Sequence, residues 1–412
     1  MFFNQEQLFT IALGLEKPWH VTKIEFNPDE QRIDLFLDFQ RGSKFRCPAC
    51  GKEAPVYDSE EKTWRHLNFF QHKAYLHARQ PRTVCPTCGV LTVSVPWARP
   101  KSDFTLLFEA FVLALVRQMP VKAIARLVGE HDTRLWRILK AYVDRARDEA
   151  DFSNVTDVGV DETSCRKGHH YITLFVDLKE SKVLFATEGK DKETVSRFRQ
   201  DLIGHRGDPD RIENFCSDLS PAFILGVNEN FPNADITFDK FHTVKIVNDA
   251  VDEVRRQEAR QNPWLKGTRY IWLKNPGNLS PAQRERLESL KSLNSKTSRA
   301  YAIKLSFQDL FQQPDIDTAR AYLKKWYWWA SHSRLEPITK AAKTVREHWN
   351  GILNWFNSRV NNGILEGINS LIQAAKAKAR GYRNPGNLIT MCYIIAGKLD
   401  FGIGYQRTLA CP

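Results

Sequence analysis

Hydrophobic and polar residues alternate over much of the first hundred positions, as in the run Ile33-Asp34-Leu35-Phe36-Leu37. A period of two is typical of strands with one buried face, and it predicts short strands and turns over residues 18–100. From Asp103 the spacing becomes helical. Asp103 could cap a helix over 104–118, and two further helices are expected at 121–128 and about 133–147.

Beyond Asn154 strand and helix patterns alternate. The expected order is strand 155–160, strand 171–176, strand 182–187, helix 192–203, strand 211–217, helix 221–228, strand 234–238 and helix 243–260. Such alternation indicates an α/β domain. Residues 261–350 interrupt it with helical sequence rich in tryptophan and charge, which we interpret as an insertion. A last helix starts near Gly363 and stops at Gly381.

The chain of 412 residues is too long for one ordinary core, since a domain usually holds about 100–200 residues. The changes of pattern predict five segments. They are an N-terminal cysteine-containing module (1–100), a helical segment (101–150), the first α/β part (151–260), the insertion (261–350), and a last part containing the final helix (351–412).

The formal charge of +12 favours a polyanionic partner. Much of it lies in residues 321–383, where 11 basic minus 3 acidic residues give +8. We expect DNA contacts there from Lys340, Lys343, Arg346, Lys376, Lys378, Arg380 and Arg383. No apolar run reaches the roughly 18 residues of a membrane span, and the N-terminus lacks the basic start of a secretory signal. A cytoplasmic protein without a membrane partner is therefore expected.

Four of the eight cysteines form two copies of one short motif, Cys-Pro-x-Cys-Gly. Each copy lets two sulfurs of one tight turn face the same ion, and zinc needs four ligands at tetrahedral corners. The motifs predict a closed, structural Zn²⁺ site, although two unrelated turns remain an alternative. Its ligands would be Cys47, Cys50, Cys85 and Cys88. The other cysteines are scattered, which indicates a reducing compartment and no disulfide framework.

The helices expected at 121–128 and 133–147 are separated by Gly129 and a short turn, as in a helix-turn-helix. Leu135, Ile138 and Leu139 supply one packed face of the second helix. The side chains left for solvent or a major groove are Thr133, Arg134 and Arg137. A plain helical hairpin is the alternative interpretation.

Three acids have the placement that metal-dependent phosphoryl transfer needs. Two Mg²⁺ ions require oxygen ligands from several chain segments. Asp161 and Asp218 each close an apolar strand, although a strand end or a helix cap would explain either one alone. Glu366 stands on a helix with two faces. The predicted apolar face is Ile364, Ile368, Leu371 and Ala375, and the polar face is Glu366, Asn369, Gln373 and Lys376.

Other candidate residues have more ordinary explanations. Glu162 would point away from Asp161 if the strand continues. We rank Asp157 and Asp177 below Asp161. Asp239 and His242 could orient a phosphate or a water, or could be a helix cap and a buried histidine. The tryptophans at 326–329 and 349–355 could stack on unpaired bases, but core packing is the favoured interpretation.

Together these motifs resemble transposases of bacterial insertion sequences, of the ISL-three family. The resemblance covers about residues 45–390 and rests on the two cysteine motifs, the helix-turn-helix, and the runs GVDETS, SDLSPAF, TFDKFHTVKIVNDAVDEVRR, KTVREHWNGILNWF and NNGILEGINSLIQAAKAKARGYRN. It implies an RNase H-like catalytic domain with a helical insertion and a DDE triad at Asp161, Asp218 and Glu366.

The resemblance also implies a polynucleotidyl transferase that binds terminal inverted repeats and target DNA and catalyses Mg²⁺-dependent strand cleavage and transfer. Mn²⁺ may replace Mg²⁺ in such enzymes. A nucleoid-associated bacterial protein that dimerises on DNA is the natural expectation. Two alternatives remain open from the sequence, a non-catalytic DNA-binding regulator and a nuclease with the same triad.

Overall fold

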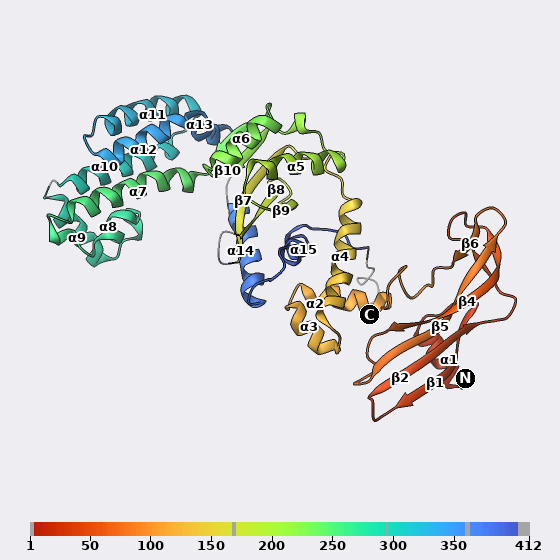
Figure 1. Cartoon of the computed structure of the whole chain (residues 1–412). Helices are drawn as coiled ribbons and strands as arrows, with labels where there is room; N and C mark the ends of the chain where they lie inside the picture. The colour runs from red at the N-terminus through yellow and green to blue at the C-terminus, as the bar shows by residue number, and fades with distance from the viewer. Residues whose placement is uncertain (1–3, 167–169, 294, 359–362, 403–412) are drawn as a thin grey trace. The chain divides into compact units, whose positions relative to one another are not determined.

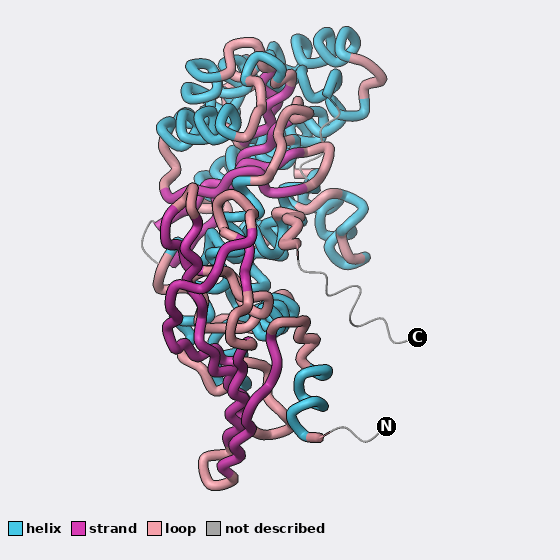
Figure 2. The backbone as a smooth tube through the Cα atoms, turned by 90° about the vertical axis from the view of Figure 1, so that its right-hand side faces the viewer, coloured by secondary structure: helices cyan, strands magenta, loops and turns pink. Residues whose placement is uncertain are grey.

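The structure, a computed structural model, describes residues 4–166, 170–293, 295–358 and 363–402 (Figure 1). Contacts within the chain divide it into two units. The first comprises residues 1–142 with 401–412, and the second comprises 143–400. Strands and helices are distinguished by colour in Figure 2. None of the helices in the described part of the chain combines the length and the apolar character that a membrane crossing needs.

The alternating N-terminal residues form a six-stranded sheet. Its order is β1-β2-β5-β4-β3, with β6 paired to β5. Ile33, Leu35 and Leu37 all lie in its core, as the alternation predicts. Two strands of 13 residues each are longer than the short strands expected. The elements are α1 (Gln5–Ala12), β1 (Trp19–Asn27), β2 (Arg32–Phe39), β3 (Lys44–Arg46), β4 (Glu53–Arg65), β5 (Lys73–Cys85) and β6 (Gly89–Thr92).

Three helices follow the sheet, at α2 (Leu106–Val116), α3 (Val121–Val128) and α4 (Asp132–Asp148). The predicted cap at Asp103 is wrong, because α2 is capped by the Thr105 side chain, which accepts the Phe108 N–H at 3.4 Å. Helix α3 ends at Gly129, whose φ of +68° suits a residue without Cβ. The predicted face of α4 at Leu135, Ile138 and Leu139 is buried.

A buried arginine joins the sheet to these helices. Arg65, at the end of β4, is only 1% exposed. Its guanidinium donates to the Val128 carbonyl at the end of α3 at 3.3 Å, and lies 3.5 Å from the Glu130 carboxylate. Its backbone N–H donates to Asp103 O, and its carbonyl accepts from Thr105 N. A buried charge needs such partners, so Arg65 fixes the helices to the sheet.

The second unit holds a mixed five-stranded sheet in the order β11-β10-β7-β8-β9. Strands β7, β8 and β9 are antiparallel neighbours, whereas β10 lies parallel to both β7 and β11. This is the arrangement of the expected RNase H-like fold. The elements are β7 (Asp157–Arg166), β8 (His170–Asp177), β9 (Lys182–Glu188), α5 (Lys192–Gly204), a 3-10 turn (Pro209–Arg211), β10 (Asn214–Ser217), α6 (Pro221–Asn230) and β11 (Asp235–Phe238).

Helices lie on both sides of this sheet (Figure 1). Helices α5 and α6 cover one side, where Val158 and Val160 of β7 pack in a core with Phe198 and Phe223. The other side is covered by α14 (Gly363–Lys378) and α15 (Pro385–Ala396). Helix α15 was not among the elements expected from the sequence. Because side chains alternate along a strand, Gly159, which lies between the two buried valines, faces α14.

The segment between β11 and α14 is helical and has its own core. Helix α7 starts earlier than the predicted residue 243, because Asp239 caps it by accepting the N–H groups of Phe241 and His242. The elements are α7 (Lys240–Glu258), α8 (Arg269–Leu273), α9 (Pro281–Lys291), α10 (Lys296–Asp309), α11 (Ile316–Ser331), α12 (Glu336–Glu347) and α13 (Trp349–Ser358), with 3-10 turns at Pro263–Leu265, Pro276–Asn278 and Leu310–Gln312.

One lysine is completely buried in this helical core. The Lys304 ammonium donates to the carbonyls of Trp272, Leu273 and Lys274 at 3.0, 2.8 and 3.2 Å. These carbonyls lie at the end of α8, and the last carbonyls of a helix receive no hydrogen bond from within the helix. Burial lowers the pKa of Lys304 to about 8, and the three carbonyls offset part of the cost of burial by accepting hydrogen bonds from the ammonium.

Candidate nucleic-acid processing site

The first predicted acid, Asp161, lies within a strand and not at its end. Strand β7 continues to Arg166, and β8 pairs with it beyond Asp161. Asp161 has the same parity as Gly159 and Thr163, so the three face α14. Glu162 points to the opposite side, as the sequence predicts for a continuing strand. Asp161 is therefore placed by two regular neighbouring strands, which hold a side chain more firmly than a loop does.

Helix α14 lies along this face of β7. The Asn369 amide donates to the Asp161 carboxylate, and the Gln373 amide donates to the Thr163 hydroxyl. The Lys376 ammonium donates to the Ser164 carbonyl. These three residues share the polar face that the sequence predicts, although their contacts with β7 were not foreseen. Asn369 and Gln373 are about one helical turn apart, which matches the rise between the alternate strand residues Asp161 and Thr163.

A glycine lets the helix approach the strand this closely. A Cβ at Gly159 would lie 2.9 Å from the Leu365 side chain. The predicted apolar face of α14 is partly wrong, because the buried residues are Leu365, Ile368 and Ile372, whereas Leu371 is 54% exposed. The error is about one position around the helix. It arises because the sequence gives the spacing of a face but not its direction toward the sheet.

The third predicted acid, Glu366, stands on the same side of α14 as Asn369, one turn earlier. Its side chain is exposed. Because Asn369 contacts Asp161 directly, Glu366 lies on the helical turn next to that contact. Because the Glu366 carboxylate is exposed, it does not help to hold the core together.

The second predicted acid, Asp218, follows the neighbouring strand β10, which pairs with β7 through Cys216 and Gly159. The Asp218 carboxylate accepts the Ser220 N–H at 3.0 Å. Its charge acts on Asp161. Burial, together with the negative charge of Asp218, raises the pKa of Asp161 to about 6. A cation bound beside Asp161 would favour its ionised form.

Asp239 and His242 belong to the same electrostatic group. Asp239 is 6% exposed, and its carboxylate lies 2.8 Å from His242 Nδ1. This contact, reinforced by the charges of Asp239, Asp218 and Asp161, raises the pKa of His242. The capping role of Asp239 is confirmed. His242 is half-buried and is not the fully buried histidine of the alternative interpretation.

The acids ranked lower in the sequence have structural partners. Asp157 lies 2.7 Å from the Lys179 ammonium and accepts the Asn214 amide at 2.7 Å. Asp177 accepts the N–H groups of Lys179 and Glu180 and so shapes the turn between β8 and β9. These contacts explain both acids without a role in chemistry.

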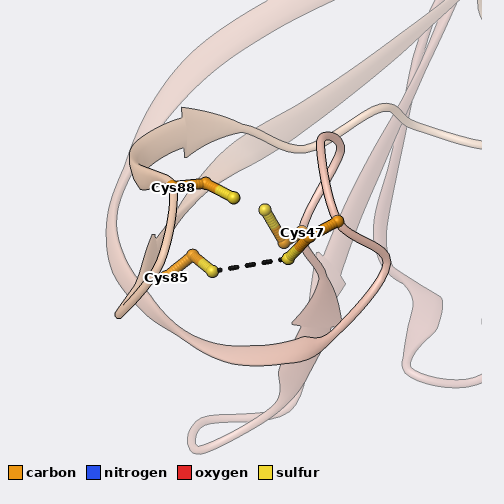
Figure 3. A group of neighbouring side chains, drawn as sticks. Cys47, Cys85 and Cys88 are labelled. Carbon is orange, nitrogen blue, oxygen red and sulfur yellow. Dashed lines mark hydrogen bonds between the residues drawn. The ribbon is translucent and has the colours of Figure 1, made fainter.

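The four cysteines of the repeated motif come together, and Figure 3 labels three of them, Cys47, Cys85 and Cys88. Their sulfurs all lie within 4.8 Å of one another, and those of Cys50 and Cys85 are 3.6 Å apart. Backbone N–H groups of Thr87 and Cys88 lower the pKa of Cys85 to about 6, which favours the thiolate that zinc binds. Four sulfurs from two turns fit a closed structural zinc site. Among the described residues, this is the only group of three or more possible ligands so close together, so Asp161, Asp218 and Glu366 do not form one.

The predicted DNA-facing residues differ in their solvent exposure and in their contacts within the protein. Thr133 and Arg137 on α4 are exposed, as are Lys340, Lys343 and Arg346 on α12 and Arg380 and Arg383 after α14. Arg134 has contacts within the protein, with the Glu130 carboxylate and the Phe104 ring. Lys376 has its contact with Ser164. Lys378 is exposed, and it too has an interaction within the protein.

Comparison with known proteins decides the family. The ISL3 DDE model, described as "Transposase", matches residues 158–392, which is more than half of the chain. The chain belongs to the ISL3 family of transposases. The helix-turn-helix domain of transposase family ISL3 matches residues 93–143 of the transposase. The zinc-finger of transposase IS204/IS1001/IS1096/IS1165 matches residues 43–92.

Curated relatives agree with this assignment. The transposase for insertion sequence element IS1557 from Mycobacterium tuberculosis is 28% identical over 429 residues, which cover 94% of this chain and 95% of the relative. The transposase for insertion sequence element IS1001 from Bordetella parapertussis is 27% identical over 386 residues, covering 90% and 94%. The chain is therefore an insertion-sequence transposase with a zinc ribbon, a DNA-binding helix-turn-helix and a DDE domain.

The zinc site predicts a simple metal dependence. Purified transposase should contain one zinc ion per chain, and Cys85→Ser should lose it, because a tetrahedral site with three thiolates binds zinc more weakly. Metal analysis measures the content, and a gel shift on DNA bearing an element's end measures binding. Cys165→Ser, at a buried cysteine in β7, is the control and should keep the zinc. Normal zinc content and binding in Cys85→Ser would contradict the assignment.

Proposed function

We propose that this transposase cleaves and joins DNA ends with a triad of Asp161, Asp218 and Glu366. The observation that carries the proposal is the position of α14 along β7, where Asn369 contacts Asp161 and places Glu366 on the adjacent turn. Asp218 lies at the end of the neighbouring strand. Three acids from β7, β10 and α14 thus border one side of the sheet, and a shared divalent ion would draw their carboxylates closer together.

The donor set fits hard cations such as Mg²⁺, with Mn²⁺ as a substitute. All three groups are carboxylates, and the raised pKa of Asp161 supports the proposal, because added positive charge would favour its ionised form. Two cations bound there would activate the attacking oxygen and stabilise the leaving oxygen of the transferred phosphodiester. Asn369 holds the Asp161 carboxylate in one orientation by donating to one of its oxygens.

We propose that His242 supplies a positive charge beside the acids, in addition to the bound cations. Its bond with Asp239 favours the charged imidazolium and fixes one ring nitrogen. The imidazolium can then stabilise a phosphate oxygen close to Asp161 and Asp218. Because Asp239 also caps α7, the fold itself sets the position of the ring.

The DNA-binding part is proposed to recognise terminal inverted repeats through Thr133 and Arg137 of α4, with Arg134 nearby. Backbone contacts are proposed for the exposed basic residues of α12 and of the segment after α14. We retain the five segments expected from the sequence as functional parts. Since transposition joins two ends of one element to a target, we propose a homodimer on DNA, acting at the bacterial nucleoid.

The triad predicts that catalysis and binding separate. Glu366→Gln, Asp161→Asn and Asp218→Asn each keep the side-chain shape but remove a charge that a hard cation needs, so cleavage and joining should fall to background. Pairs of these changes should add little to one, since the three act as a unit. The measurement uses a labelled terminal-repeat duplex with Mg²⁺ or Mn²⁺, beside a gel shift on the same DNA.

Asp157→Asn is the matched control, because Asp157 lies on the same strand but is held by Lys179. It should retain joining if it folds. Near-normal joining by Glu366→Gln would disprove the triad, and loss of binding along with joining would make Glu366 a structural residue. Cleavage without joining in the unmodified protein would favour a nuclease.

The histidine predicts a shift in pH dependence. Asp239→Asn keeps a good helix cap but removes the negative partner that raises the His242 pKa. The imidazolium should then lose its proton at lower pH, so joining should decline with rising pH earlier than in the unmodified protein. Joining rates across the neutral range measure the shift, with His242→Gln as the reference without an ionisable ring. Identical profiles in all three proteins would remove His242 from the mechanism.

The basic residues of α12 predict a change in salt dependence. Replacing Lys340, Lys343 and Arg346 with Gln should weaken DNA binding and reduce its log–log salt slope by about 0.9 for each lost phosphate contact on duplex. Binding titrations at several salt concentrations give the slope. Replacement of Lys266, an exposed lysine of the same helical segment, is the control. An equal slope in the triple variant would place the DNA elsewhere.

A further inference from the structure

Helix α11 carries a row of cationic and aromatic side chains that the proposed catalytic site does not use. Arg320, Lys324, Trp328 and His332 follow one another at intervals of four residues, so they lie along one side of the helix and its end. Trp328 is 65% exposed, and its ring stacks on that of His332 with the ring centres 4.9 Å apart. Trp329, the next residue, is 41% exposed.

The fold of the insertion does not require these two indoles. The tryptophan that α11 contributes to the core is Trp326, which is 2% exposed and donates its ring N–H to the Ile303 carbonyl at 2.9 Å. The expectation that the tryptophans of 326–329 pack in the core is therefore confirmed for Trp326 and wrong for Trp328 and Trp329. Two large apolar rings exposed on neighbouring positions are costly in water unless a partner covers them.

The charge around the rings specifies the partner. Residues 318–335 contain no acidic residue and four basic ones, Arg320, Lys324, Lys325 and Arg334. Arg320 is partly neutralised, since it lies 3.2 Å from the Asp317 carboxylate, but Lys324 and Lys325 are exposed beside the indoles. Exposed aromatic rings among lysines suit a ligand whose flat rings are joined by negatively charged groups. Unpaired nucleotides have this chemistry, whereas a duplex hides its base faces.

We propose that Trp328 and Trp329 form a stacking platform for unpaired bases of DNA, with Lys324 and Lys325 contacting the phosphates. The platform extends the proposed function, because strand cleavage at an element's end frees a strand end that can separate from its partner. It does not depend on which acids perform the cleavage. The strand that loses its pairing would be held by the insertion, apart from the duplex that the helix-turn-helix binds.

The test measures binding of a short dye-labelled oligothymidylate and of a duplex bearing an element's end, using the full chain. Trp328→Ala with Trp329→Ala should weaken oligothymidylate binding at least about fivefold, while duplex binding stays within about twofold. Phenylalanine at both positions should restore most of the affinity, because it keeps an aromatic face. Tyr270→Ala removes a ring that is 62% exposed on α8 of the same insertion, and it should change neither affinity.

Unchanged oligothymidylate binding by the double alanine variant would overturn the proposal, as would an equal loss in Tyr270→Ala. A change from dimer to monomer in sedimentation, with both DNA affinities unchanged, would show instead that the face binds another copy of the chain. Asp161→Asn separates the two proposals. It should still bind oligothymidylate, so a wrong triad would appear only in cleavage and a wrong platform only in single-strand binding.

Discussion

The contact of helix α14 with strand β7 is the constraint on which the proposed chemistry depends. In the sequence, Asn369 lies 208 positions after Asp161. The helix can lie along the strand because Gly159 leaves room for Leu365, and because the side chains of Asn369 and Gln373 donate hydrogen bonds to β7. A buried amide or carboxylate without a partner would cost free energy, so these contacts fix the register of the helix. That register decides where Glu366 stands.

The same contact explains why the insertion can be large without disturbing the site. Helices α7 to α13 leave the sheet after β11, form a core of their own, and return through α13, which packs against β11. Within that core the exceptional group, Lys304, has three carbonyl acceptors. Lys304 therefore needs no partner outside the insertion, and the exposed side chains of the insertion remain available for binding. The two exposed indoles of α11 are the clearest case.

In the first unit a different pair of constraints acts. Two tight turns bring four sulfurs together at one end of the sheet, and a bound metal ion would hold those turns where the hydrophobic core is small. At the junction with the helices, Arg65 links β4 to the end of α3 and to Glu130. These contacts join the sheet to the helices within the first unit. Arg134, which also contacts Glu130, serves this junction as well as lying next to the exposed face of α4.

The sequence by itself determined the features that depend on local spacing. The repeated cysteine motif, the helix ending at Gly129, the alternation in β2 and the polar face of α14 all follow from residues a few positions apart. Only the tertiary structure decided what depends on distant partners. It extended β7 beyond Asp161 through pairing with β8, turned the buried face of α14 to Leu365, Ile368 and Ile372, and left Trp328 exposed while burying Trp326. Periodicity gives the shape of a face, but its direction is set by packing against segments that are far away in the sequence.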